Sequence, residues 1–448
     1  MPEFPADFVA SMQQQLGEDW NDFVATFAQD RPVSIHLNLA KPGLDISGTP
    51  IPWNPNGRYL LERPSFTTDP HFQAGRYYVQ EAGSMFLAYV IAALQQKRTL
   101  HTVLDLCGAP GGKTTLLLNH LPQHTVVVSN EVIKSRFAIL RHNLAKWGRA
   151  NVIATQADPK HFAACTGLFD LLVVDAPCSG EGLFRKTREA MQEWSTGSVQ
   201  LCQSRQRRIL HDAWPLVSGD GFLVYSTCTY NELENDGNVQ WLCEEAGFDV
   251  VDLDVPSDWN IVRTHYGYQF YPHRTQSEGF YLAVLQKTTE TKSSKRNKML
   301  RHPYYQPAGK QVQTVGQSWL RDKTELHILQ DPKGQLYSIH PASESFLPSL
   351  YGLKRYVPGT PLGQVKGQGV VPDHTLALSI HLSDQILRWE VDEKQALSFL
   401  RKEPLHRAEA PASQGWHLIT YDGWGLGWVK LLPNRVNNYL PKTWRVLC

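Results

Sequence analysis

Residues 102–114 read Thr-Val-Leu-Asp-Leu-Cys-Gly-Ala-Pro-Gly-Gly-Lys-Thr, an apolar run that ends in a glycine-rich loop. The run predicts a buried strand, and a helix is expected after the loop. Glycines at such a turn let the backbone approach a ligand, and the N-terminus of the next helix favours polar or anionic groups. The loop therefore indicates a site for a nucleoside cofactor. Its residues are Cys107, Gly108, Ala109, Pro110, Gly111, Gly112 and Lys113.

The spacing of the glycines in this loop is also compatible with two other interpretations. One is a simple tight turn. The other is a phosphate loop of the GxxxxGK[ST] type, in which Cys107 replaces the first glycine. The apolar residues 172–174, followed by Asp175, imitate the strand that holds Mg²⁺ in enzymes with such loops.

Outside the loop, short apolar runs alternate with helical patterns. This rhythm favours a parallel sheet covered on both faces, and hence an α/β, Rossmann-like core. The expected strands are 126–128, 152–154, 171–174, 222–225 and 280–285, and the expected helices include 135–146 and 199–217.

The whole chain of 448 residues is too long for one core. We expect an α+β part over 1–90 with a helix over 5–27, followed by parts at 91–288, 289–370 and 371–448. The polar run 287–298, rich in Thr, Ser and Lys, predicts a linker. The last part has many short β-like runs.

Composition narrows the class of protein. The chain has 42% hydrophobic residues and a net charge of +1, which argues against a broad polycation. It has no apolar run of about twenty residues, and its first residues lack the order of a signal peptide, so we expect a cytoplasmic protein without a membrane partner. Local basic stretches at 185–188 and 205–208 remain candidates for phosphate contacts.

The seven cysteines do not form a disulfide framework by spacing, and no cluster has zinc-ligand spacing, so no metal is expected. Cys178 and Cys228 differ from the others because each directly follows a predicted strand, in Asp175-Ala-Pro-Cys178 and Ser226-Thr-Cys228. The carboxyl ends of parallel strands border one crevice, so the two thiols should converge beside the cofactor loop. The remaining cysteines are interpreted as inert side chains: Cys107, Cys165, Cys202, Cys243 and Cys448.

Three acidic residues also end predicted strands. Glu131 lies where an acidic side chain accepts hydrogen bonds from a ribose diol. Asp158 is a candidate contact for an adenine edge, with a helix N-cap as the alternative. Asp175 ends the strand before Cys178, and its roles at the base and at the cofactor follow from the resemblance given next.

At these residues the chain resembles the RNA cytosine-5 methyltransferases that use S-adenosylmethionine. The resemblance covers about residues 30–290, and Gly108 stands where alanine is commoner. The tail, at 423–430 and 434–441, resembles the F-type group of bacterial small-subunit rRNA methyltransferases. The motifs that carry the first resemblance are DLCGAPGGKT at 105–114, Asn130-Glu131, DAPCSGEG at 175–182 and STCTY at 226–230.

The resemblance implies a fold, a substrate and roles. It implies a mostly parallel seven-stranded catalytic sheet over 91–288, an RNA-positioning domain over 1–90 and a PUA-like RNA-binding domain over 371–448. The target would be one cytosine of the decoding region of 16S rRNA, in naked rRNA or in the small ribosomal subunit. Cys228 would attack carbon 6, Cys178 would assist release, and Asp175 would hydrogen-bond the base.

Three competing functions are weighed against this one. A P-loop-like NTPase would hydrolyse ATP with Mg²⁺ and would give the two cysteines no role. An RNA-binding module on a degenerate scaffold would require a disrupted motif, whereas all motifs are intact. A methyltransferase acting on another rRNA or tRNA cytosine keeps the chemistry and changes the target. A monomer is expected.

Overall fold

The computed structural model describes residues 4–289, 302–321, 325–367 and 369–447. Most of the predicted linker, from residue 290 onward, therefore lies outside the described residues. Its first residue, Lys287, still belongs to a strand. Among the helices in these ranges, none is long and apolar enough to cross a membrane.

The N-terminal part joins two short helices to a small antiparallel sheet with the order β2-β3-β1-β4. The helix expected over 5–27 is divided, because Gly17 adopts φ +56 and ends the first helix there. Aromatic side chains on both halves pack against the catalytic part of the chain, including Phe184 and Trp194. These elements are α1 (Ala6–Leu16), α2 (Trp20–Ala25), β1 (Val33–Leu37), β2 (Thr49–Ile51), β3 (Asn54–Leu60), α3 (Pro70–Gln73) and β4 (Tyr77–Val79).

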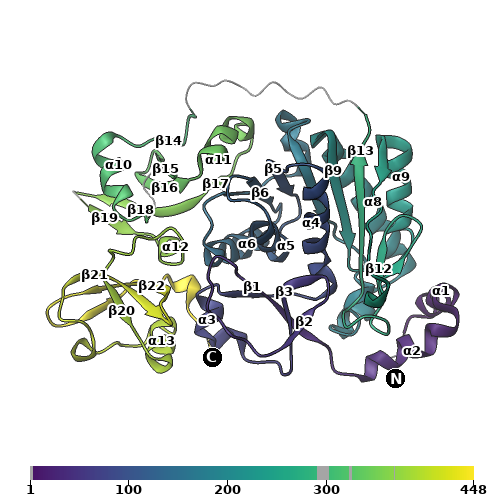
Figure 1. Cartoon of the computed structure of the whole chain (residues 1–448), viewed down its shortest axis with the longest axis horizontal. Coiled ribbons are helices and arrows are strands. Elements are labelled where there is room, and N and C mark those ends of the chain that lie inside the picture. The colour runs from purple at the N-terminus through teal and green to yellow at the C-terminus, as the bar shows by residue number, and fades with distance from the viewer. Residues whose placement is uncertain (1–3, 290–301, 322–324, 368, 448) are drawn as a thin grey trace.

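A ten-stranded sheet forms the centre of the molecule (Figure 1). Its path is β11-β12-β13-β9-β8-β5-β6-β7-β17, and β10 also pairs with β13. The five strands from β9 to β7 are parallel, and the others are antiparallel. The strands are β5 (Thr102–Asp105), β6 (Val126–Asn130), β7 (Val152–Thr155), β8 (Phe169–Asp175), β9 (Val217–Thr227), β10 (Phe248–Val250), β11 (Val262–Arg263), β12 (Tyr268–Phe270), β13 (Phe280–Lys287) and β17 (Tyr356–Pro358).

The predicted α/β core is confirmed, and the sheet is larger than predicted. Seven strands form the expected unit, namely β7, β6, β5, β8, β9, β13 and β10. Two short strands, β11 and β12, extend one edge. At the other edge β17, which lies some two hundred residues later in the sequence, pairs with β7.

Helices cover both faces of this sheet, because successive strand residues point to opposite sides. Val103 and Val127 pack under the helices of one face, whereas Leu104 and Val128 pack under those of the other. The first face carries α4 (Leu87–Lys97), α5 (Gly112–His120) and α6 (Lys134–Trp147). The second carries α8 (Thr196–Ala213), α9 (Asp236–Ala246) and α11 (Pro341–Phe346), and α7 (Arg188–Glu193) lies beside the N-terminal helices.

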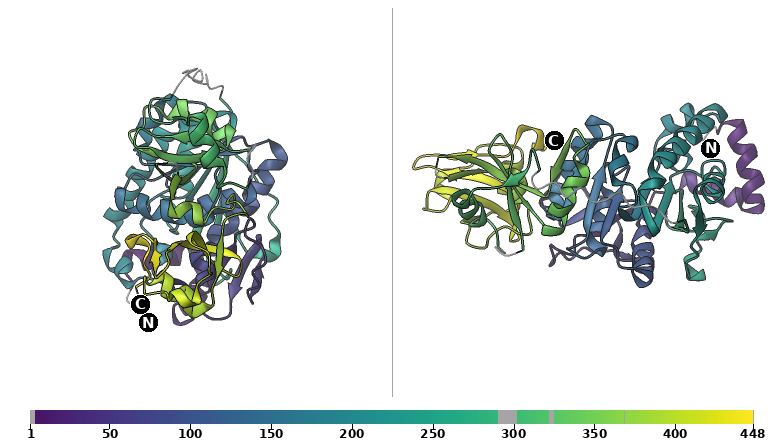
Figure 2. Two further views of the ribbon diagram at one scale, coloured as in Figure 1. Left: turned by 90° about the vertical axis from the view of Figure 1, so that its left-hand side faces the viewer. Right: turned by 90° about the horizontal axis from the view of Figure 1, so that it is seen from above.

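Two more sheets follow residue 302, and the views in Figure 2 show them beside one end of the central sheet. The predicted domain boundary between residues 370 and 371 lies within strand β19 and stays a prediction. The first sheet contains β14 (Gln306–Pro307), β15 (His327–Gln330), β16 (Gln335–Ile339), β18 (Thr360–Lys366) and β19 (Gly369–Pro372), with helix α10 (Lys310–Gln317). The second contains β20 (Arg388–Glu390), β21 (Gly415–Tyr421), β22 (Trp424–Leu431) and β23 (Val436–Asn438), with α12 (His374–Ala377) and α13 (Glu393–Leu400).

A buried lysine joins three parts of the chain. The Lys41 ammonium is 2% exposed and donates hydrogen bonds of 2.7 Å to the carbonyl oxygens of Ala74, Lys146 and Leu378. These acceptors belong to the N-terminal part, the end of α6 and the C-terminal part. A buried ammonium with three acceptors is fully paired, so Lys41 fixes these segments relative to one another.

Candidate active site

The site lies where the strand order reverses. From β5 the chain continues outward through β6 and β7, and it then returns to the other side of β5 with β8 and β9. Ligands bind outside the carboxyl ends of strands at such a switch point. Asp105 ends β5, Asp175 ends β8 and Thr227 ends β9, so all three strands deliver polar side chains to the same edge.

The glycine-rich loop follows β5 and leads into α5, as the sequence predicts. Gly108 N–H donates to the carbonyl of Asn130 at 2.7 Å, which ties the loop to the end of β6. Gly111 has φ +124, a conformation that favours glycine. A Cβ at Gly108 would lie 2.4 Å from Ser129 Oγ. The loop is therefore packed tightly against β6.

A buried acid supports this loop from below. Asp105 is fully buried and accepts a 2.6 Å hydrogen bond from Thr114 Oγ1, which in turn lies 2.8 Å from Ser129 Oγ. Burial raises the pKa of Asp105 to about 7. The sequence places Asp105 in the motif but gives no sign of this packing role, because Ser129 approaches from another strand.

A cavity of about 190 Å³ lies beside the loop. Cys107, Gly108, Ala109, Pro110, Gly112, Lys113 and Asp175 line one side, and Tyr78, Val79, Gln80, Glu81 and Ser84 line the other. The second group comes from β4 and the turn after it, which sequence reasoning missed. Gln80 Nε2 donates to Ser84 Oγ at 2.9 Å, and the Gln80 side chain also interacts with the buried His36 ring.

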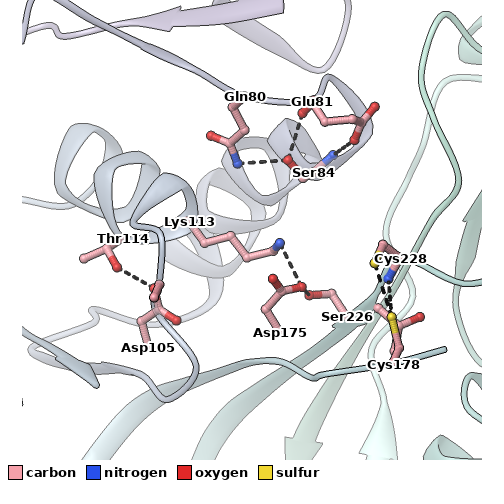
Figure 3. Close-up of polar contacts among 12 residues, drawn as sticks. Gln80, Glu81, Ser84, Asp105, Lys113, Thr114, Asp175, Cys178, Ser226 and Cys228 are labelled. Atoms are coloured by element: carbon pink, nitrogen blue, oxygen red, sulfur yellow. Dashed lines mark hydrogen bonds and ion pairs between the residues drawn. The ribbon is translucent and has the colours of Figure 1, made fainter. Parts of the chain in front are cut away.

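Lys113 connects the loop to the strand end of β8. Its ammonium lies 2.8 Å from Asp175 Oδ1 and 5.0 Å from the centre of the Phe280 ring. Ser226 Oγ donates to the same carboxylate oxygen at 2.8 Å (Figure 3). Asp175 is thus positioned by a cation from the cofactor side and by a hydroxyl from the cysteine side.

The two predicted thiols meet. Cys178 Sγ and Cys228 Sγ are 3.2 Å apart, and the backbone N–H of Cys228 donates to Cys178 Sγ at 3.4 Å (Figure 3). The contact with Cys228 and burial raise the pKa of Cys178 well above its usual range. The two sulfurs are therefore within hydrogen-bond distance of each other, and either can be the donor.

Two buried carboxylates hold the cysteine segments from behind. Glu234 accepts from the Ser179 N–H at 3.0 Å and from Gln206 Nε2 at 2.7 Å. Glu181 accepts from the Tyr230 N–H at 3.0 Å and from Trp194 Nε1 at 2.9 Å. Burial raises the pKa of both carboxyl groups. These contacts fix the backbone on the carboxyl side of each cysteine.

The other two predicted acids lie around the loop rather than on the cavity wall. Glu131 is buried, accepts from the Ile133 N–H at 2.9 Å and lies 3.5 Å from Arg136, which also donates to the carbonyl of Ala109. Asp158 accepts from the Lys160 N–H at 3.3 Å and so caps the next helical turn. The capping alternative for Asp158 is thus observed, and its contact with an adenine stays a prediction.

The remaining cysteines in the described ranges form no disulfide bonds. Cys165 is buried and donates to the carbonyl of Ser349 at 3.3 Å, and Cys107 lines the cavity. Cys448 lies outside the described residues. In the part of the chain that the structure describes, no group of three or more His, Cys, Asp or Glu side chains has an arrangement that would hold a metal ion.

Comparisons with known proteins match the chain along its length. The model for the N-terminal domain of 16S rRNA methyltransferase RsmF matches residues 4–82, the 16S rRNA methyltransferase RsmB/F model matches 91–286, and the RsmF PUA domain model matches 387–446. Ribosomal RNA small subunit methyltransferase F from Aliivibrio fischeri is 28% identical, with 98% of this chain and 97% of that protein covered. The protein of the same name from Cronobacter sakazakii is 29% identical, with 98% and 95% covered.

Solved structures show the same fold. A methyltransferase homologue from Pyrococcus horikoshii has a TM-score of 0.54 and 24% identity, with 63% of this chain and 95% of that chain covered. NSun6 from Pyrococcus horikoshii with SFG has a TM-score of 0.54 and 18% identity, with 64% and 100% covered. With its N-terminal, catalytic and PUA segments matched in order, the chain belongs to the RsmB/F family of 16S rRNA methyltransferases.

Proposed function

We propose that the protein transfers a methyl group from S-adenosylmethionine to carbon 5 of a cytosine in 16S rRNA, through a covalent bond between Cys228 and carbon 6. The family supports an rRNA methyltransferase. The observation that carries the finer chemistry is the 3.2 Å contact between two sulfurs from neighbouring strand ends beside the cofactor cavity.

The cavity fits a nucleoside cofactor with a charged sulfonium and amino acid part. It combines the close backbone approach of residues 107–112 with the polar side chains of Gln80, Glu81 and Ser84. We assign cofactor binding to Cys107, Gly108, Ala109, Pro110, Gly111, Gly112 and Lys113, with Glu131, Asp158 and Asp175 at its ends. Bound S-adenosylmethionine supplies an electrophilic methyl group.

Carbon 5 of cytosine is a weak nucleophile, which gives Cys228 its role. Addition of the Cys228 thiolate to carbon 6 forms an S–C6 bond and makes carbon 5 nucleophilic, so one hard step becomes two easier ones. The motif resemblance assigns attack to Cys228 and assistance to Cys178, and the 3.2 Å contact between the two sulfurs supports a joint role.

Release requires that a base accept the carbon 5 proton, that the C5–H electron pair form the C5=C6 double bond, and that the S–C6 pair return to the Cys228 sulfur; the deprotonated Cys178 sulfur is the proposed base. Cys178 lies against that sulfur and assists this elimination. Asp175, which contacts Lys113 and Ser226, would accept hydrogen bonds from the N4 amino group and from N3 once N3 is protonated. The target cytosine must leave its stack to reach these groups.

The test uses the covalent species. Full-length Cys178→Ala, incubated with 16S rRNA and S-adenosylmethionine, should accumulate an RNA–protein species that survives denaturation. Cys228→Ala should form none and should not methylate. Methylation by Cys228→Ala at the wild-type rate would contradict the assignment of the nucleophile.

The substrate and the competing functions are tested separately. Mapping 5-methylcytosine in rRNA and tRNA from cells with and without the gene identifies the target, which we expect in the decoding region of 16S rRNA. Assays on naked 16S rRNA and on small subunits decide which of the two is the substrate. Calorimetry should detect S-adenosylmethionine binding and no Mg²⁺-dependent ATP binding, since Lys113 is paired with Asp175.

A further inference from the structure

A buried arginine without a partner lies two residues beyond the C-terminal end of α6. Arg149 follows Gly148, which caps α6 in the left-handed conformation, and is 8% exposed. Among the described residues no hydrogen bond or ion pair of its guanidinium is observed, and its Nε is buried without an acceptor. Burial lowers the pKa of this group. A buried cation is costly unless an anion or acceptors surround it.

The plain structural explanation is that Arg149 caps the carbonyl groups at the end of α6. The contacts exclude it. The carbonyl of Lys146 accepts from Lys41, that of Trp147 from Asn38 Nδ2, and that of Gly148 from the Ile380 N–H. These three carbonyl groups are therefore satisfied by other donors, and no hydrogen bond joins the guanidinium to the helix end among the described residues.

Arg149 lines a cavity of about 40 Å³ between α6, the β7–β17 edge of the central sheet and the C-terminal part. Arg141, an exposed residue about two helical turns earlier on α6, also lines it, together with Thr360 and Thr375. The cavity wall contains no carboxylate. The hydroxyl groups of these two threonines make no hydrogen bond within the described residues and remain available as donors.

From this geometry we infer a binding site for a phosphate group in this cavity, held by Arg149 and Arg141 with Thr360 and Thr375. Arginine is suited to this ligand because its planar fork donates two parallel hydrogen bonds to phosphate oxygens. The volume admits one compact oxyanion. Two sources supply it: a free phosphate ion, or a backbone phosphate of the bound RNA. Because the site touches β17, α6 and α12, its occupation would also stabilise the docking of the C-terminal part.

The free-ion source is tested by thermal unfolding of the full chain in potassium phosphate and in potassium chloride of equal ionic strength. We expect the wild-type midpoint to rise by at least about 2 °C in phosphate. Arg149→Met should lose this shift, and Arg149→Lys should retain only part of it because it lacks the fork. Arg63→Met, which removes an exposed arginine outside the cavity, should retain it in full.

The RNA source is tested by binding of a 16S rRNA fragment in phosphate-free buffer over a range of salt concentrations. If an RNA phosphate occupies the site, Arg149→Met lowers the affinity, decreases the salt slope by about 0.7 to 0.9, and inorganic phosphate competes with RNA for the wild type only. Unchanged RNA binding together with a lost phosphate shift identifies the free ion as the occupant.

Two results would overturn the inference. One is a phosphate shift that persists in Arg149→Met, which places the anion elsewhere. The other is the absence of both the phosphate shift and any RNA-binding difference between wild type and Arg149→Met. If Arg149→Met does not fold, Arg149→Lys gives the same two readouts.

Discussion

The two sides of the active site, the glycine-rich loop (the loop side) and the segments of Cys178 and Cys228 (the thiol side), are held in place in different ways. On the loop side, polar atoms are tied to one another: Asp105, Thr114 and Ser129 form a chain of hydrogen bonds, and Asn143 Nδ2 donates to the carbonyl of Pro110. On the thiol side, the sulfurs of Cys178 and Cys228 contact each other, and their segments are held through the neighbouring backbone.

This difference suggests that the side chains of the loop side maintain the structure of the site, whereas the sulfurs of the thiol side carry out the reaction. A side chain with partners all round holds the fold, so its loss should change stability or cofactor affinity. A reactive atom whose support comes through the backbone can be exchanged without disturbing the fold, so its loss should change turnover. Substitutions on the loop side should therefore change stability or cofactor affinity, and substitutions on the thiol side should change turnover.

The largest effect is expected on the thiol side. Cys228→Ser should lower turnover at least about 10³-fold, because a hydroxyl is far less nucleophilic than a thiolate. The affinity for S-adenosylmethionine and the unfolding midpoint should change little. Methyl transfer to 16S rRNA, calorimetry and thermal unfolding measure the three quantities.

Cys202→Ser is the matched control for this variant, since Cys202 lies on α8 and has no proposed role. It should keep wild-type turnover. Turnover by Cys228→Ser within tenfold of the wild type would break the proposed division between the two sides.

The next effect is a pH dependence on the loop side. The pKa of Asp105 is about 7 in the folded chain and 3.8 ordinarily, so the folded state holds its proton more tightly. Stability from this group is present below pH 4 and is lost as the pH rises to 7, by up to about 4 kcal/mol. Asp105→Asn should remove this loss.

The measurement is urea unfolding of wild type and Asp105→Asn at pH 5 and pH 8. The fall in midpoint between the two values should be smaller in the variant. Asp45→Asn, which changes an exposed carboxyl group, should behave like the wild type. An equal fall of the unfolding midpoint in all three proteins would show that titration of Asp105 does not cause the pH dependence.

A smaller effect is expected at the junction of the two sides. Lys113→Met removes the cation from Asp175 and from the face of the Phe280 ring while keeping an unbranched side chain. We expect the KM for S-adenosylmethionine to rise about tenfold, equivalent to about 1.4 kcal/mol. Lys113→Arg should recover part of the loss, and a change in kcat alone would place Lys113 on the thiol side instead.

Much of the fold and of this site follows from local sequence. Short apolar runs define β5, β6, β8 and β9, and the position of a residue at the end of a parallel strand predicts which edge it occupies. The convergence of Cys178 and Cys228 needs nothing more, because their strands are neighbours. Local pattern is sufficient wherever the site is made by consecutive parallel strands.

The rest depends on contacts between distant segments. Gln80 and Ser84 reach the cavity from the segment that follows β4, and nothing in that segment marks them as ligands. β17 joins the sheet edge with only three residues, too few for a periodic signal. The environment of Arg149 likewise exists only after α6 and the C-terminal part have packed together.

The smallest effect tests how tightly the loop is packed. In Gly108→Ala the new Cβ would lie 2.4 Å from Ser129 Oγ and 3.2 Å from Thr114 Oγ1. Relief requires that the Ser129 side chain or the loop shifts, at a cost of about 1 kcal/mol, with a similar loss of cofactor affinity. Ser129→Ala in the same chain removes the obstructing oxygen and should restore stability. Thermal unfolding of the two single variants and the double variant measures this coupling, and strictly additive effects would show that the loop has room for alanine beside Ser129.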